Sequence, residues 1–174
     1  MRRLTAVWIF FVAAVCAAAP SPVTTVILVR HAEKAGPAGD VPLSPAGIER
    51  ANELVRVLAG TSIAAVYTTP YLRTEQTAAP LAKAHVLEPI IVKTGDTYGR
   101  DLVETIRHQH AGETVVVVGH SNTTADVVKQ LGIANPPAMA DSQYDDLFVV
   151  SLSGDSAKLV ALRYGKESRA SRPE

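Results

Sequence analysis

Two arginines and two histidines lie at or shortly after the ends of three apolar, β-branched segments: Arg30, His31, Arg73 and His120. A guanidinium group presents a planar set of N–H donors that matches the oxygens of a phosphate. A neutral imidazole can accept a phosphoryl group on a ring nitrogen, and a second imidazole can stabilise the oxygens as charge develops on them. The set therefore predicts phosphoryl transfer, and the positive side chains supply the field without a metal or other cofactor.

These residues can meet only if the segments before them are neighbouring strands. The segments that predict strands are 23–29, 63–68, 89–92 and 114–118, and those that predict helices are 44–59, 70–84, 101–110 and 122–131. This alternation is typical of an α/β fold, a three-layer sandwich with a mostly parallel central sheet and helices on both faces. A closing hairpin is expected around Ser153-Gly154-Asp155. The carboxyl ends of parallel strands meet at one edge, so the candidate residues should converge there.

The first predicted helix has clear signals at both ends. Ser44 and Pro45 are typical of a helix N-cap and first turn, and Gly60 is typical of a helix end. Four apolar residues follow helical spacing and are expected on its buried face: Ile48, Ala51, Val55 and Leu58.

In these motifs the chain resembles the histidine phosphatase superfamily, which includes cofactor-dependent phosphoglycerate mutases and short phosphohistidine phosphatases. The resemblance spans about residues 23–152, and it rests on four segments: Val26–Glu33, Leu43–Gly47, Thr69–Ala78 and Val115–His120. It implies a phosphoglycerate mutase-like fold and a metal-independent phosphatase. Ala32 stands where the family signature usually has glycine, and we expect it to be tolerated.

The resemblance also assigns roles to the candidate residues. His31 is expected to become phosphohistidine, and Arg30, Arg73 and His120 are expected to complete the phosphate pocket. Ser121 is expected to contact the substrate, because the helix after His120 directs its first amides toward a bound anion. Ser121 or Asn122 is then the expected N-cap of that helix.

The general acid is left open. Phosphomonoesterases and mutases of the family protonate the leaving oxygen with a carboxylic acid, either in the loop after the third strand or directly after the second histidine, where this chain has Ser121. The segment after the third predicted strand offers Asp96, Asp101 and Glu104, of which Asp96 is nearest the strand. Glu33 is a further candidate, although an orienting or surface role suits it better.

The predicted substrate is a phosphomonoester or related phosphoryl compound, either a small molecule or a headgroup phosphate. Short loops predict an open, shallow site, which suits a large or protein-borne phosphate as well as a sugar phosphate. Two alternatives stay open. The first is a phosphate-binding module without turnover. The second is a serine ester hydrolase using Ser121, although Thr123 replaces a glycine of the nucleophile elbow and no histidine follows Ser121.

Composition excludes other classes of protein. The 174 residues include 17 Lys+Arg and 17 Asp+Glu, so there is no basic excess for a dedicated nucleic-acid binder. The single cysteine, Cys16, excludes an intrachain disulfide. The candidate ligands His31, Glu33 and His120 lack a closely spaced pair, such as His-x-x-x-His, that would mark a zinc site.

Residues 1–19 have the layout of a secretory signal peptide, with Arg2 and Arg3 before the apolar run Leu4–Val15 and small residues after it. We expect an exported, periplasmic or secreted protein without a stable membrane span after processing. The expected organisation is a signal peptide over 1–19, a phosphatase domain over 20–167 and a polar tail over 168–174. An uncleaved anchor and a lipid anchor at Cys16 are less favoured, the latter because Val15 occupies a position where a small residue is usual.

Overall fold

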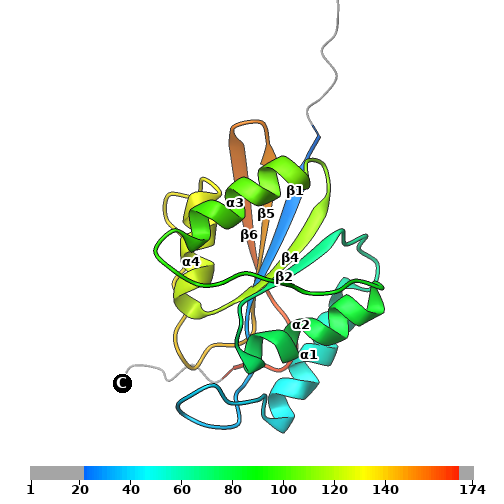
Figure 1. The fold of residues 1–174 in the computed structure, drawn as a ribbon, viewed down its shortest axis with the longest axis vertical. Coiled ribbons are helices and arrows are strands. Elements are labelled where there is room, and N and C mark those ends of the chain that lie inside the picture. The colour runs from blue at the N-terminus through cyan, green and yellow to red at the C-terminus, as the bar shows by residue number, and fades with distance from the viewer. Residues whose placement is uncertain (1–21, 169–174) are drawn as a thin grey trace, which may run out of the picture.

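A six-stranded mixed sheet forms the centre of the computed structural model, which describes residues 22–168 (Figure 1). The strands are β1 (Thr24–Arg30), β2 (Ala65–Thr68), β3 (Ile90–Ile91), β4 (Thr114–Gly119), β5 (Asp146–Ser153) and β6 (Ser156–Arg163). Their order is β3-β2-β4-β1-β5-β6; β1 to β4 run parallel to one another, and β5 pairs antiparallel with both β1 and β6. The predicted leader and nearly all of the polar tail lie outside the described residues.

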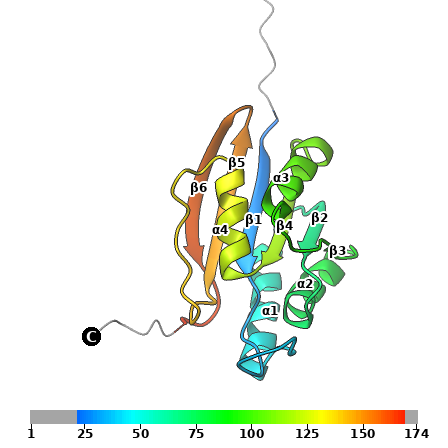
Figure 2. The same cartoon turned by 60° about the vertical axis from the view of Figure 1, so that its left-hand side comes forward.

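Four helices cover the sheet in two pairs (Figure 2). The helices are α1 (Pro45–Leu58), α2 (Leu72–Ala84), α3 (Tyr98–Gln109) and α4 (Ser121–Gln130). Helices α1 and α2 pack on one face, and α3 and α4 on the other. The prediction of an α/β sandwich with helices on both faces is confirmed. Among the described helices, none combines the length and the apolar character that crossing a bilayer requires.

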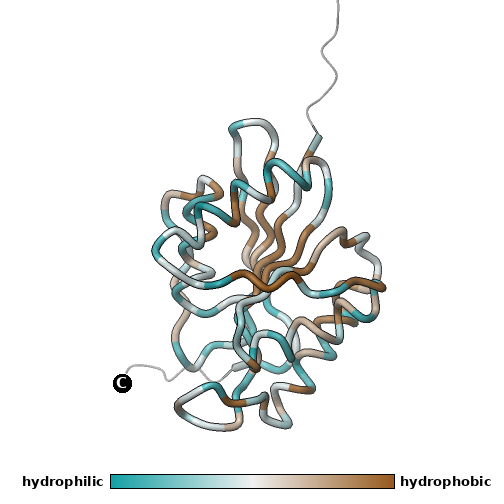
Figure 3. Tube along the Cα trace, viewed as in Figure 1, coloured by the Kyte–Doolittle hydropathy of each residue, from teal (hydrophilic) through white to brown (hydrophobic). Residues whose placement is uncertain are grey.

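The valine run of β4 reflects a sheet that is buried on both faces. Val115 and Val117 pack toward α3 and α4, whereas Val116 and Val118 pack toward α1 and α2. Because alternate residues point to opposite faces, a central parallel strand needs apolar residues at every position. The hydrophobic centre of the sheet is visible in Figure 3.

Helix α1 begins as predicted but presents a different face to the core. The Ser44 hydroxyl accepts a hydrogen bond from the Gly47 N–H at 3.1 Å, as an N-cap does. A Cβ on Gly47 would lie 2.1 Å from the Glu33 carbonyl oxygen, so only glycine allows this close approach. The prediction that Ile48 is buried is wrong, since its side chain is about half exposed and Arg50 takes the inward position.

The other elements differ from the prediction mainly at their ends. Helix α2 begins at Leu72 rather than at Pro70, and α3 begins at Tyr98 rather than at Asp101. The third strand shortens to two residues at the edge of the sheet. The hairpin of β5 and β6 turns at Gly154, as expected.

Candidate active site

The carboxyl ends of β1 and β4 and the start of α2 enclose a pocket of about 340 Å³. Its lining residues are Arg30, His31, Lys34, Tyr71, Arg73, Thr94, His120, Ser121, Asn122 and Thr123. The ring centroids of His31 and His120 lie 5.4 Å apart. The two histidines are close because parallel pairing of β1 with β4 sets Arg30 opposite Gly119, so the next residue of each strand leaves the sheet at the same edge.

His31 is held with one ring nitrogen occupied. Its Nδ1 lies 2.8 Å from the carbonyl oxygen of Ala32, which can only accept, so Nδ1 carries the proton and Nε2 keeps its lone pair. Burial is the main cause that lowers the pKa of His31 to about 3, and the nearby charges of Arg30, His120 and Arg73 contribute to the same shift. The ring is therefore neutral at neutral pH, which is the form that a nucleophile requires.

The backbone around His31 is fixed by both neighbouring elements. The His31 N–H donates to the carbonyl oxygen of Gly119 at 2.8 Å. The Ala32 N–H donates to the Thr77 hydroxyl at 3.0 Å, and that hydroxyl donates to the Arg73 carbonyl at 2.7 Å. The Ala32 methyl group is fully buried and packs with Leu43 and Ala51, away from the pocket lining.

His120 is oriented by a chain of hydroxyl groups. The Thr74 hydroxyl donates to the carbonyl oxygen of Thr69 at 2.8 Å, so it accepts from the Thr69 hydroxyl at 2.9 Å. The Thr69 hydroxyl in turn accepts from His120 Nε2 at 2.9 Å. Burial, followed by the charges of Arg73 and Arg30, lowers the pKa of His120 to about 4.

His120 itself is the N-cap of α4, which corrects the expectation for Ser121 or Asn122. The His120 N–H donates to the Thr123 hydroxyl at 2.8 Å. Ser121 and Asn122 form the first turn, where backbone N–H groups have no partner within the helix. The positive end of α4 therefore faces the pocket beside His120.

Arg30 is only 6 % exposed, and most of its bonds go to the loop before β5. Its Nη1 donates to the carbonyl oxygens of Ala140 (3.0 Å), Asp141 (2.9 Å) and Gln143 (3.2 Å). The guanidinium stands 4.5 Å above the ring of Tyr144. Its Nε is buried without a partner among the described residues. A buried donor left unpaired costs about 1–3 kcal/mol, so an anion oxygen bound at Nε would remove a real cost.

Arg73 enters the pocket from α2 and stacks on Tyr71, with its Cζ 4.6 Å from the ring centroid. Its Nη1 lies 3.7 Å from Asp40 Oδ1, which also accepts the Leu72 N–H at 2.9 Å. Asp40 thus accepts a backbone N–H of the first turn of α2 and also holds Arg73 at the pocket. The Tyr71 ring also packs edge-on against His120, with centroids 5.1 Å apart.

No carboxylate lines the pocket within residues 22–168. Asp96 is exposed in the turn before α3, two residues beyond Thr94, which does line the pocket. Asp101 accepts hydrogen bonds from Thr97 and Arg100, and Glu104 lines a separate hollow on α3. The structure therefore brings together the cationic and imidazole candidates but not the three candidate acids from the 94–104 segment.

Glu33 belongs to a different arrangement. Its carboxylate accepts three hydrogen bonds from Arg50, at 2.7, 3.0 and 3.1 Å. Arg50 is 4 % exposed and also donates to the carbonyl oxygens of Tyr164 and Lys166. The pair ties the segment after His31 to α1 and to the chain beyond β6.

The sequence did not predict that Lys34 and Thr94 line the pocket, nor that Asp141 and Tyr144 contact its lining residues. Asp141 and Tyr144 lie in the loop between α4 and β5, where the sequence has no apolar periodicity. Tyr144 packs against Arg30 and lies 5.9 Å from the His31 ring. Asp141 Oδ1 lies 3.4 Å from the Ser121 hydroxyl. The buried guanidinium of Arg30 holds this loop at the site, because it donates hydrogen bonds to three carbonyl oxygens of the loop.

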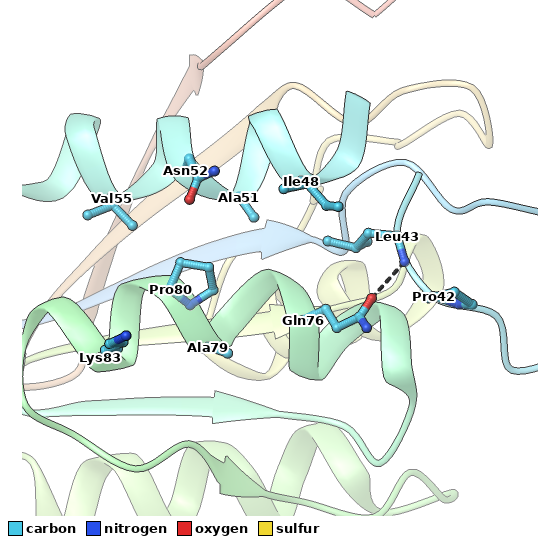
Figure 4. A pocket seen from close by; sticks show the side chains of 10 residues that line it. All are labelled: Pro42, Leu43, Ile48, Ala51, Asn52, Val55, Gln76, Ala79, Pro80 and Lys83. Carbon is cyan, nitrogen blue, oxygen red and sulfur yellow. Dashed lines mark hydrogen bonds between the residues drawn. The ribbon is translucent and has the colours of Figure 1, made fainter. Parts of the chain in front are cut away.

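A larger hollow of about 790 Å³ lies between α1 and α2, and Figure 4 shows its mostly apolar walls. At one end the Leu43 N–H donates to Gln76 Oε1 at 2.7 Å. Lys83 is its one charged lining residue in the described part of the chain, and no nucleophile lines it. The groups that can perform chemistry are gathered in the smaller pocket. Nowhere in 22–168 do three or more His, Cys, Asp or Glu side chains group as metal ligands would.

The comparisons with known proteins agree with the motifs. The model of the histidine phosphatase superfamily (branch 1) matches residues 26–94, which contain three of the four segments that carry the resemblance. This match confirms the resemblance to that superfamily. No curated protein sequence matches the chain.

Solved structures share the fold at low sequence identity. A protein histidine phosphatase SixA complexed with tungstate has a TM-score of 0.65 at 20% identity, over 80% of this chain and 96% of that one. A mycobacterial glucosyl-3-phosphoglycerate phosphatase has a TM-score of 0.63 at 15% identity, over 82% of this chain and 98% of that one. A phosphoserine phosphatase from Entamoeba histolytica has a TM-score of 0.61 at 17% identity, over 78% of this chain and 94% of that one. The prediction of a phosphoglycerate mutase-like fold is confirmed.

Proposed function

We propose that this chain is a histidine phosphatase that hydrolyses phosphomonoesters or a related phosphoryl compound through a phosphohistidine on His31. One observation carries the proposal: a buried, neutral imidazole with its Nε2 lone pair available lies beside the buried guanidinium of Arg30, whose Nε lacks a partner among residues 22–168. Such a site favours a tetrahedral anion, because the anion supplies acceptors to unpaired donors and brings phosphorus near a nucleophile.

In the first step, His31 Nε2 attacks phosphorus and the bond from phosphorus to the leaving oxygen breaks. The imidazole then carries positive charge, and the Ala32 carbonyl oxygen that accepts from Nδ1 stabilises it. In the second step, water attacks the phosphorus of phosphohistidine. The P–N bond breaks, inorganic phosphate leaves, and His31 returns to its neutral form.

Arg30, Arg73 and His120 are proposed to hold the phosphoryl oxygens. The two arginines lower the pKa of His120 in the unliganded pocket. A bound phosphate dianion opposes their field, so we expect His120 to take up a proton on binding and donate to an oxygen of the phosphoryl group. The positive charge would then be present only when there is an anion to stabilise.

The serine hydrolase alternative has little geometric support. The Ser121 hydroxyl contacts Asp141, and the His120 Nε2 that could have activated it is bonded to Thr69. The nucleophile of a serine hydrolase needs a histidine base within hydrogen-bond reach.

Trapping of the phosphoenzyme tests the function. Wild-type protein is incubated with a ³²P-labelled aryl phosphate, quenched in alkali and digested. We expect label on the peptide that contains His31, and we expect His31→Ala to lose both label and turnover while its circular dichroism spectrum is unchanged. Near-normal turnover by His31→Ala would refute the proposal. Tight binding of phosphate without label or turnover in wild type would favour a binding module.

Two finer points belong to the proposal. Activity is expected to be metal-independent, because the described cationic side chains supply the field, and full activity after dialysis against EDTA tests this. Export is proposed from the layout of residues 1–19. The N-terminal sequence of the protein recovered from the periplasm or medium tests it, and an intact Met1 on all recovered protein would contradict cleavage.

A further inference from the structure

We propose that Asp141 is the general acid that protonates the leaving oxygen, an assignment that rests on the phosphatase function proposed above. The reaction of an alkyl phosphate requires such a group, because an alkoxide is a poor leaving group unless it receives a proton as the bond breaks. The lining of the pocket supplies cations, hydroxyls and imidazoles but no carboxyl group among the described residues. The acid must therefore reach in from the mouth.

Two carboxylates bond or pair with side chains that line the pocket, Asp40 with Arg73 and Asp141 with Arg30 and Ser121. Asp40 has a structural task, because its Oδ1 accepts the Leu72 N–H at 2.9 Å in the first turn of α2. The Asp40 side chain is therefore engaged at the start of α2.

Asp141 has no comparable task for its carboxylate. The side chain is 96 % exposed, and its Oδ1 makes two long contacts, 3.4 Å to Ser121 Oγ and 3.9 Å to Arg30 Nη2. Its position is nevertheless fixed through the backbone, because the Asp141 carbonyl oxygen accepts from Arg30 Nη1 at 2.9 Å. The same arginine that is proposed to hold the phosphate thus sets the place of the carboxyl group.

The exposed side of the pocket is where the leaving group must lie. His31 is buried on one side of the phosphate position, and in-line displacement directs the leaving oxygen to the opposite side, toward solvent. Ser121 lines the pocket and contacts the solvent-exposed carboxylate of Asp141, so we infer that this carboxyl group reaches that side. Asp96, the first candidate from sequence, is separated from the lining by Gly95 and forms no hydrogen bond or ion pair with a lining side chain of the described chain.

In the proposed cycle the Asp141 carboxyl group gives up one proton and regains one. His31 Nε2 forms the bond to phosphorus while the bond from phosphorus to the ester oxygen breaks, and that oxygen takes the proton of the Asp141 carboxyl group and leaves as an alcohol. The Asp141 carboxylate then accepts a proton from the water that attacks phosphohistidine. Phosphate departs, and both residues return to their starting forms.

The dependence of the reaction rate on the leaving group distinguishes a general acid from a residue with a structural role. The rate of phosphoenzyme formation is measured with p-nitrophenyl phosphate, whose leaving group needs little protonation, and with glycerol phosphate, whose leaving group needs it. We expect Asp141→Asn to slow the alkyl substrate about 10²- to 10⁴-fold, the range of general acid catalysis, and the aryl substrate far less. Asp141→Glu should recover part of the loss on the alkyl substrate.

Asp155→Asn, an exposed aspartate in the β5–β6 turn, is the matched control and should change neither rate. Equal losses on both substrates in Asp141→Asn would overturn the proposal in favour of a structural role for the loop. A selective loss on the alkyl substrate in Asp96→Asn instead would assign the acid to Asp96. Both outcomes differ from failure of the phosphatase function, in which His31→Ala keeps its turnover.

Discussion

The buried pair of Glu33 and Arg50 provides a direct test of whether Glu33 is structural or catalytic. Glu33→Gln keeps the shape of the side chain but removes the negative charge that faces a guanidinium only 4 % exposed. Loss of one partner of a buried pair leaves an uncompensated charge and costs about 3–5 kcal/mol. Glu33 retains 24 % side-chain exposure, so water compensates in part and we expect a smaller loss than this, about 2–3 kcal/mol.

Chemical and thermal unfolding measure this loss. For a domain of this size, about 2–3 kcal/mol corresponds to a fall in Tm of roughly 4–12 °C. Turnover at low temperature should keep the wild-type ratio of aryl to alkyl phosphate rates, because the carboxylate contacts Arg50 and not the pocket.

The exposed pair of Arg56 and Glu53 on the same helix is the control. Its side chains are 72% and 39% exposed, and Glu53→Gln should cost at most about 1 kcal/mol. The structural interpretation of Glu33 would be refuted if Glu33→Gln unfolded like wild type and lost activity on the alkyl substrate alone. That result would make Glu33 the acid.

Three further predictions concern the pocket itself. Arg73→Ala should weaken the transition state by about 2–4 kcal/mol, seen as a fall of roughly 30- to 1,000-fold in kcat/KM, with little change in Tm; an unchanged kcat/KM would contradict its placement. Thr69→Val removes the acceptor for His120 Nε2 at 2.9 Å and should lower kcat roughly three- to tenfold, whereas the conservative Thr69→Ser should restore it. Folding holds the pKa of His31 near 3 against an ordinary value of 6.5, so the unfolded chain takes up a proton first and stability is lost as pH falls from 6.5 toward 3. Denaturant titrations across that range should show a flatter decline for His31→Asn, and parallel declines would contradict the burial of a neutral ring.

The sequence was sufficient to predict the sheet and the charged groups at its edge. Consecutive β-branched residues in β1 and β4 mark strands buried on both faces, which is typical of parallel strands covered by helices. Once β1 and β4 are neighbours, His31 and His120 leave the sheet at the same edge. Their proximity therefore follows from the topology alone.

The face of α1 could not be predicted in the same way. Hydrophobic spacing favours Ile48 as a buried residue, yet the helix turns Arg50 inward because Glu33 offers a carboxylate and the chain after β6 offers two carbonyl oxygens. Apolar periodicity takes no account of a buried ion pair. The partners of Arg50 come from segments far apart in the chain, and only the assembled fold brings them together.

Of the two tyrosines that orient the arginines, only one comes from a recognisable motif. Arg30 stacks on Tyr144 and Arg73 stacks on Tyr71, with 4.5 and 4.6 Å between guanidinium carbon and ring centroid. A stacked guanidinium keeps its N–H edges available while its side-chain freedom is already reduced, so less entropy is lost when an anion binds. Tyr71 lies in a motif that the sequence displays, whereas Tyr144 lies in a loop whose path is set by the buried Arg30. The charge of the pocket can therefore be predicted from local motifs. Its preorganisation depends on Arg30, which lines the pocket and also holds the loop before β5 in place.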